Sequence, residues 1–368
     1  MIKFNNYSPL IFSILICSYG MSTASIASTE NFVYNAFLAI IITIYFFLRL
    51  ARNQIFNKNI LVLLFLSLIP LMITSRMNLA SLFLMITLVL LKNKIFHSNE
   101  RRTYLLISLC LLVLVFFANH FFDFNAAYSK EIFNPREEKF IYREALGFTH
   151  PNQAMLKALG ISLIILLGCT RRNVVRYSVF TLIFIFILYY FTESRTVPFV
   201  ILITSCFLVL FRKKLDEDVP IFLKKIVSLY PLMFLALTLI SMNLSQNVFL
   251  NLLFSGRLGF YHTAFASYGL TLFGNPVIEK SSTIVVDSSY LNTLLSKGVL
   301  FFFCYALIYK CATNLTIMTY KKAILTTSFF MCAFTETMFF KFDLMFALLL
   351  ILFYDKRCEN YEKNFNLS

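Results

Sequence analysis

Apolar residues along this chain gather into long runs, and clusters of charged residues separate one run from the next. Most runs hold about 15–20 residues, which as a helix is enough to cross the roughly 30 Å hydrocarbon core of a bilayer. The pattern predicts an all-α integral membrane protein, a polytopic bundle of about twelve transmembrane helices. The expected spans lie near residues 9–28, 31–48, 60–74, 79–91, 103–119, 152–169, 175–192, 196–211, 226–243, 291–309, 322–340 and 343–354.

The spacing of these runs predicts one polytopic membrane domain over residues 1–368, with no separate soluble domain. Two connections are long, the external loops at about 120–151 and 244–290, and long loops in a compact chain are usually functional. The second loop is rich in apolar residues. It predicts an amphipathic helix, from Arg257 to Tyr268, that lies in the outer membrane interface. A short polar tail, residues 355–368, is expected on the cytoplasmic side.

Charge then orients the bundle. The chain is 59% hydrophobic and only 14% charged, yet it carries a net charge of +15. Cytoplasmic loops of membrane proteins retain Lys and Arg. With both termini in the cytoplasm, 22 of the 33 Lys and Arg residues face that side and nine face the other. Topology therefore accounts for the positive charge, and no nucleic-acid partner is needed to explain it.

Reactive side chains concentrate on the external side, where three of the four His residues and most loop carboxylates are expected. The chain contains no HExxH, CxxC, Walker or GxSxG motif. Metalloprotease, thiol-redox, nucleotide-hydrolysing and α/β-hydrolase activities therefore lack support.

The first candidate corner runs from Arg143 to Asn152, directly into the sixth expected span. Pro151 suits the first turn of a helix, so Thr149 or His150 should lie near the N-cap. The free N–H groups of that helix would favour an anion such as phosphate. The alternative is that Pro151 only starts a span and His150 is a solvated cap.

A second corner, Glu193 to Thr196, has the same design, with Pro198 in the first turn of the next span. Arg195 either binds phosphate through its two-pronged guanidinium or anchors the helix in the interface. Arg257, at the start of the expected amphipathic helix, likewise either binds an anion or extends its charge toward the interface.

Three further residues complete the candidates. Asp287 precedes the tenth span and is either a helix cap or an acid/base group. Glu336 and Lys297 fall inside apolar runs, where an ionisable group is costly unless it is paired or faces a polar cavity. They could pair with each other if the tenth and eleventh spans pack together.

These motifs resemble the Wzy-type polymerases of bacterial O-antigens and capsular polysaccharides, within the O-antigen ligase and polymerase superfamily. The resemblance extends over roughly residues 140–300, with a similar order and spacing of motifs. The motifs that carry it are Leu146-Gly147-Phe148-Thr149-His150-Pro151-Asn152, Glu193-Ser194-Arg195-Thr196, Gly256-Arg257 with Leu272-Phe273-Gly274-Asn275, and Asp287-Ser288-Ser289-Tyr290.

The resemblance implies an enzyme that joins undecaprenyl-diphosphate-linked oligosaccharide repeat units at the outer face of the bacterial cytoplasmic membrane. It implies no cofactor and no metal. The implied partners are the lipid-linked oligosaccharides, membrane lipid, and the flippase and chain-length regulator of the same pathway. The residues that it places in substrate binding are Arg143, Asn152, Arg195, Arg257 and Tyr290, and those that compete for the role of general base are His150, Glu193 and Asp287.

Three alternatives remain at this point. An O-antigen ligase would use much the same fold to move a finished glycan onto another acceptor. A polysaccharide flippase or other transporter should place polar and helix-breaking residues near the membrane midplane, whereas the charges here lie at the external rim. A non-catalytic component of a glycan-assembly complex would not depend on its external Arg residues.

Overall fold

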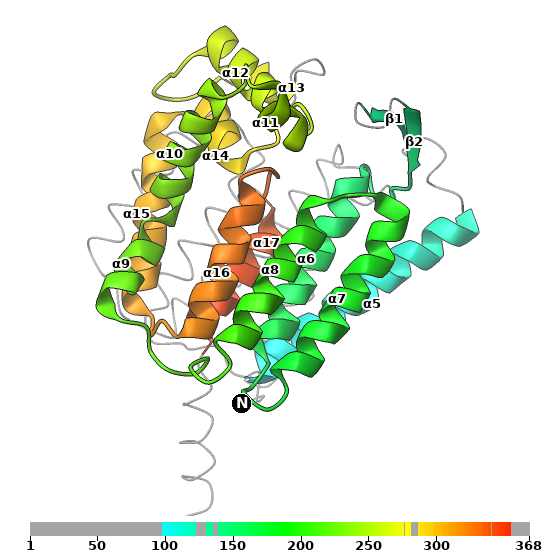
Figure 1. Cartoon of the computed structure of the whole chain (residues 1–368), viewed down its shortest axis with the longest axis vertical. Helices are drawn as coiled ribbons and strands as arrows, with labels where there is room; N and C mark the ends of the chain where they lie inside the picture. Colours follow the sequence, from blue (N-terminus) through cyan, green and yellow to red (C-terminus); the bar gives the residue numbers. More distant parts are fainter. Residues whose placement is uncertain are drawn as a thin grey trace, which may run out of the picture.

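The structure is a computed structural model of the chain, and it describes residues 98–122, 130–134, 139–275, 277–280, 286–339 and 341–354. This part is mostly helical, as the sequence predicts, and its helices form a bundle with a smaller group of helices over one end (Figure 1). The first four expected spans and the expected cytoplasmic tail lie outside the described residues.

The helices of the bundle follow the apolar runs of the sequence. They are α5 (Ser98–Phe122), α6 (Pro151–Leu167), α7 (Val174–Thr192), α8 (Thr196–Leu210), α9 (Ile221–Ser228), α10 (Tyr230–Asn243), α14 (Ser289–Asn292), the π-helix Thr293–Lys297, α15 (Val299–Leu315), α16 (Tyr320–Ala333) and α17 (Phe342–Phe353).

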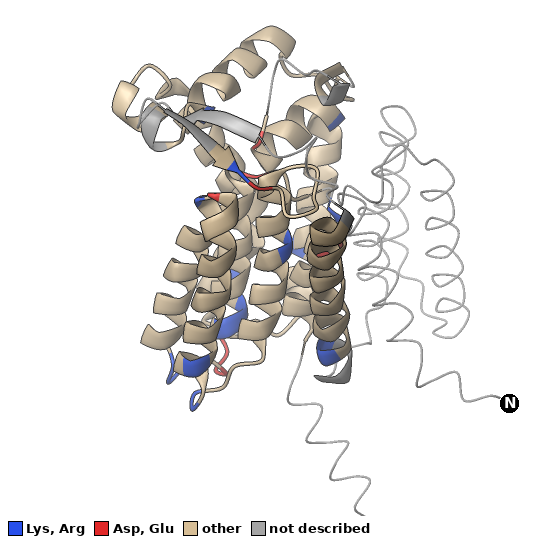
Figure 2. Ribbon diagram, turned by 90° about the vertical axis from the view of Figure 1, so that its right-hand side faces the viewer, with Lys and Arg blue, Asp and Glu red and all other residues tan. Residues whose placement is uncertain are grey.

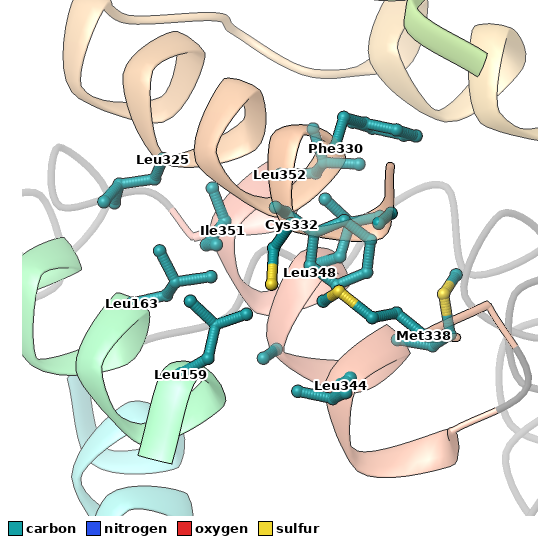
Figure 3. Packing of buried hydrophobic residues seen from close by; sticks show 14 of the residues in the cluster. Leu159, Leu163, Leu325, Phe330, Cys332, Met338, Leu344, Leu348, Ile351 and Leu352 are labelled. Carbon is teal, nitrogen blue, oxygen red and sulfur yellow. The ribbon is translucent and has the colours of Figure 1, made fainter. Parts of the chain in front are cut away.

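Helix α6 is the centre of the bundle. Nearly all of its residues are buried, and it packs against α5, α7, α8, α16 and α17. Leu159 and Leu163 of α6 meet Leu325 of α16 and Leu348 of α17 in an apolar core (Figure 3). Because α6 is held from several sides, its N-terminus at Pro151 has a fixed position, and the candidate site is built around that terminus.

Two described helices are long and apolar enough to cross a membrane, Arg101–Phe121 within α5 and Val174–Thr192. A third span results if α9 and α10 are taken together, since they are separated by one residue and bent by 58°. Pro231 in the first turn of α10 explains the break, because its ring excludes a helical hydrogen bond there. Several of the other bundle helices are apolar but shorter than 18 residues.

The tenth expected span, 291–309, is broken and not continuous. It consists of α14, the π-helix and α15, with Gly298 at φ 92° between the last two. The backbone of Gly274 packs so closely on this break that a side chain at either glycine would collide with the other segment. These two glycines permit a backbone contact that breaks the span.

Both long loops are structured over their described residues. The first contains an antiparallel hairpin of β1 (Lys130–Asn134) and β2 (Lys139–Arg143), which an all-α prediction did not include. The second contains α11 (Val248–Leu253), α12 (Arg257–Tyr268) and α13 (Val277–Lys280). The expected helix from Arg257 to Tyr268 is confirmed. Its buried face, with Tyr261 at its centre, packs on a small apolar cluster above α10 and α14.

The opposite end of the bundle is basic, as Figure 2 shows. Lysine side chains there hydrogen-bond the last carbonyls of neighbouring helices, an arrangement favoured by the helix dipole. Lys322 donates to the carbonyl of Leu352 (2.9 Å), and Lys224 donates to that of Thr316 (2.8 Å). This end corresponds to the side that the charge count assigns to the cytoplasm.

The orientation can be tested on α8, which separates Glu193 from Asp218. We expect reporter fusions after Glu193 and after Asp218 to report opposite sides of the membrane. Asp218 should lie in the cytoplasm, because Lys and Arg are concentrated at the end of the bundle that carries it. Alkaline phosphatase and a fluorescent protein are suitable reporters, since each is active on one side only. The same side for both fusions would show that α8 does not cross.

Candidate functional site

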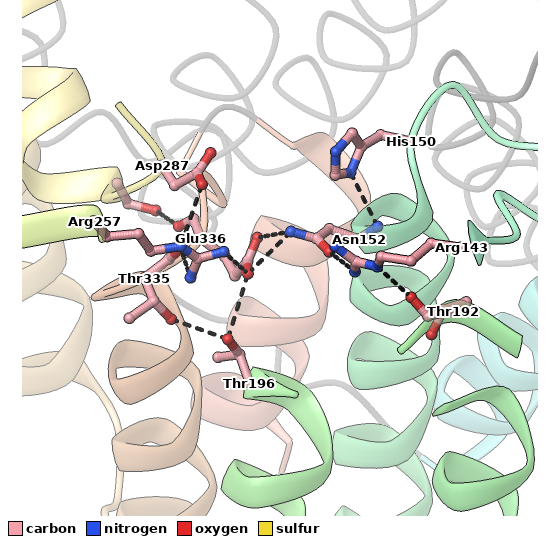
Figure 4. Close-up of polar contacts among 10 residues, drawn as sticks. Arg143, His150, Asn152, Thr192, Thr196, Arg257, Asp287, Thr335 and Glu336 are labelled. Carbon is pink, nitrogen blue, oxygen red and sulfur yellow. Dashed lines mark hydrogen bonds and ion pairs between the residues drawn. The ribbon is translucent and has the colours of Figure 1, made fainter. Parts of the chain in front are cut away.

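Polar side chains from six segments meet where α6 and α8 begin. They form a continuous chain of hydrogen bonds and ion pairs, which we call the rim cluster (Figure 4). Its members are Arg143, Asn152, Thr196, Arg257, Asp287, Thr335 and Glu336. The cluster lies at the end of the bundle that carries α11–α13 and the hairpin.

The first half of the rim cluster is the corner that opens α6. Arg143, the last residue of β2, donates from Nε to the carbonyl of Thr192 (2.7 Å) and from Nη2 to Oδ1 of Asn152 (2.8 Å). The first contact joins β2 to the end of α7. The second fixes the Asn152 amide so that its Nδ2 points toward Glu336.

His150 is the N-cap of α6, so the predicted helix start is confirmed. Its Nδ1 accepts a hydrogen bond from the backbone N–H of Asn152 (3.1 Å). In a neutral imidazole the proton must then be on Nε2, which makes that atom a donor and not a base. The cap geometry therefore favours His150 as a hydrogen-bond donor to an oxyanion over His150 as the general base.

The second half of the rim cluster is Arg257, whose guanidinium has a partner at every nitrogen. Its Nε lies 3.3 Å from Oδ2 of Asp287, its Nη1 donates to the carbonyl of Thr335 (2.7 Å), and its Nη2 donates to Oε1 of Glu336 (3.0 Å). Although burial acts to lower the pKa of Arg257, the two carboxylates raise it above its ordinary value. Of the two roles left open for Asp287, the structure excludes the helix cap, because Ser288 caps α14.

Glu336 connects the two halves. It lies in the turn between α16 and α17 and is 4% exposed. Its carboxylate accepts hydrogen bonds from Arg257 and from the hydroxyl of Thr196 (3.4 Å). Nδ2 of Asn152 donates to both carboxylate oxygens (3.3 Å each). Burial raises the pKa of Glu336, and the charge of Arg257 opposes this. Glu336 thus pairs with Arg257, while Lys297 is buried in the π-helix.

Arg195 and Glu193 lie beside the rim cluster, and within the described part of the chain neither side chain is hydrogen-bonded to it. Arg195 is the exposed N-cap of α8, and Glu193 ends α7 in a left-handed conformation with φ 49°. Both act on Arg143 electrostatically. Burial lowers the pKa of Arg143, the like charges of Arg257 and Arg195 lower it further, and the carboxylates of Glu336 and Glu193 oppose these effects. Arginine nevertheless stays charged at any physiological pH.

Tyr290 lies apart from the rim cluster. Its side chain is fully buried, stacks on Phe234 and donates a hydrogen bond to the carbonyl of Phe330 (2.8 Å). The ring therefore belongs to the aromatic core between α10, α14 and α16. The predicted substrate contact of Tyr290 has no support from this geometry.

Two residues near the cluster were not among the predicted site residues. Tyr261, one turn after Arg257, is buried, and burial raises its pKa, as do the charges of Asp287 and Glu336. Lys341 donates to Oε1 of Gln153 (2.6 Å), the neighbour of Asn152 on α6. Burial and the nearby charge of Lys157 lower the pKa of Lys341 to about 8. The one-turn spacing on the expected helix links Tyr261 to Arg257, whereas nothing local linked Lys341 to Asn152.

The rim cluster can hold an anion and move a proton. Guanidinium, amide and hydroxyl donors suit oxyanions, and a carboxylate at the edge of such a site can accept a proton. Asp287 is the more accessible carboxylate, with a third of its side chain exposed. Among the described residues, no group of three or more His, Cys, Asp and Glu side chains could hold a metal ion.

Comparison of the chain with protein-family models, with curated proteins and with solved structures found no match.

Proposed function

We propose that this chain is a polysaccharide polymerase of the Wzy type, which joins undecaprenyl-diphosphate-linked repeat units at the outer face of a bacterial cytoplasmic membrane. The proposal includes twelve transmembrane spans with both termini in the cytoplasm. One observation carries it: Arg143, Arg195 and Arg257 come from three distant segments, yet they lie around one polar cluster at the end of an apolar bundle.

The chemistry of the transfer needs this arrangement. Breaking the bond between the glycan and its carrier leaves negative charge on a diphosphate, and guanidinium groups stay charged and match phosphate geometry. Helix α6 adds its N-terminus, whose dipole favours an anion. In the proposed reaction the Arg residues hold the diphosphate and the acceptor hydroxyl loses a proton to a base.

Of the three predicted bases, Asp287 suits the role best. When its imidazole is neutral, His150 carries the proton on Nε2 and donates there. Glu193 has no described hydrogen bond to the rim cluster. Asp287 lies next to Arg257 and remains partly exposed, so a sugar hydroxyl could reach it. A carboxylate in that position can accept the proton that the acceptor hydroxyl loses.

Deleting the gene tests the reaction. We expect surface glycan that carries single repeat units and no long chains, because a polymerase acts after export and before attachment. Gel analysis of the glycan gives the chain-length distribution, and a plasmid copy of the gene should restore it. A ligase mutant would instead accumulate long lipid-linked polymer, and that result would contradict the polymerase.

A further inference from the structure

The Glu336 carboxylate is surrounded by donors of the kind that a phosphate group needs. They come from three helices: the Asn152 amide on α6, the Thr196 hydroxyl on α8 and the Arg257 guanidinium on α12. Such a set of charged and neutral N–H and O–H donors binds any tetrahedral or planar oxyanion. In this structure Glu336 itself is that oxyanion.

Glu336 occupies the Asn152 amide, the Thr196 hydroxyl and Nη2 of Arg257. Every nitrogen of Arg257 has a partner, and the Oδ1 atom of Asn152 is bound to Arg143, which prevents the amide from turning away. The other partners of Arg257 occupy its other two nitrogens and not Nη2. The Thr335 carbonyl is fixed backbone, whereas Asp287 is a partly exposed carboxylate that contacts Nε alone.

For Glu336 to leave these donors, its side chain would have to rotate. It lies in a turn and not in a helix, and the turn is held by Ser289, whose hydroxyl donates to the Glu336 carbonyl (2.5 Å) and accepts from the N–H of Met338 (2.7 Å). The backbone therefore keeps its position when the carboxylate moves. This would expose Arg257 Nη2, the Asn152 amide and the Thr196 hydroxyl together.

We propose that Glu336 is an internal substitute for the substrate phosphate, and that the diphosphate binds by displacing the Glu336 carboxylate from Arg257, Asn152 and Thr196. The inference rests on the proposed function and gives the place of the phosphate within that site. A carboxylate that competes with the ligand lowers the ligand's affinity, so its removal must tighten binding. A carboxylate that only supports the fold would have the opposite effect.

The test measures diphosphate binding to the purified full-length protein in nanodiscs. Inorganic pyrophosphate and farnesyl diphosphate are used as separate probes, which distinguishes a free diphosphate from a lipid headgroup. In Glu336→Gln we expect the Kd of both probes to fall about tenfold, or about 1.4 kcal/mol, because a neutral amide competes less well for Arg257. Tightening for farnesyl diphosphate alone would assign the site to the lipid headgroup.

Glu144→Gln is the matched control, because it removes the same charge from the same end of the protein, next to the β2–α7 contact. We expect its Kd values to stay within about threefold of wild type, since the Glu144 side chain has no described contact with Arg257, Asn152 or Thr196. Glu336→Asp serves as a second variant if the Gln form does not fold. Its shorter carboxylate is withdrawn from Arg257 and should also tighten binding.

The outcomes separate the two proposals. Unchanged or weaker binding in the folded Glu336 variants, with wild type still binding, would overturn the displacement and leave the proposed function standing. Equal tightening in Glu144→Gln would reduce the effect to overall charge and also overturn it. If neither wild type nor the variants bind either probe, the diphosphate site itself is wrong.

Discussion

Replacing Arg257 with lysine should lower polymer formation by about 10²–10³-fold, the usual effect of losing one transition-state donor. Lysine keeps the positive charge but has one nitrogen in place of three, so it cannot contact Asp287, Thr335 and Glu336 together. The lysine ammonium would have no fixed orientation toward the leaving diphosphate. The measurement is the chain-length distribution of the glycan at matched protein level in the membrane.

Arg176→Lys is the control for this prediction. Arg176 is exposed on α7 near the opposite end of the bundle, and surface substitutions of this kind usually have little effect. Arg195→Lys completes the set. Arg195 is exposed at the start of α8, and we expect a smaller loss there than at Arg257. Wild-type polymer in both Arg257→Lys and Arg195→Lys would show that these residues anchor helices and do not bind substrate.

The parts of the site that local sequence determines were predicted well. Pro151 and Pro198 each lie in the first turn of a helix, and α12 begins at Arg257. Proline in a first turn has a fixed φ and needs no N–H partner, so its signal depends little on the rest of the fold. The sequence therefore identified which segments carry the corners of the site.

The contacts between these segments were not predictable. Glu336 is 184 residues from Asn152 and 79 from Arg257, so no spacing rule connects them. The only signal was the cost of a carboxylate in an apolar run, which indicates a partner but does not name it. The apolar residues Met338 and Phe339 extended the expected eleventh span to residue 340, whereas α16 ends at Ala333 and the turn that holds Glu336 follows.

Side-chain direction was a second limit of the sequence. Asp287 and Tyr290 belong to one motif, yet Asp287 contacts Arg257 and Tyr290 enters the aromatic core. Residues three apart on a helix share a face, but Asp287 precedes α14 and does not follow that rule. Only the packing of α10 and α16 around Tyr290 determines which of the two can meet substrate.

The largest change in stability should come from removing one partner of the ion pair between Lys157 of α6 and Asp343 of α17. Their atoms Nζ and Oδ2 lie 2.6 Å apart, and both side chains are at most 10% exposed. Asp343→Asn leaves a buried lysine without its carboxylate, which usually costs about 3–5 kcal/mol. We expect a loss of that size in the apparent free energy of unfolding in mixed micelles.

A neutral replacement of the whole pair should recover most of this loss. Burying two charges is itself costly, so apolar residues of similar volume are often as stable as the pair. We therefore expect Lys157→Met with Asp343→Leu to be close to wild type. Asp216→Asn is the matched control, because Asp216 also pairs with a buried lysine, Lys321, but is 59% exposed. The free energy of unfolding of Asp216→Asn should fall by less than about 1 kcal/mol. Equal losses in Asp343→Asn and Asp216→Asn would show that water reaches the α6–α17 interface and that the pair does not hold the two helices together.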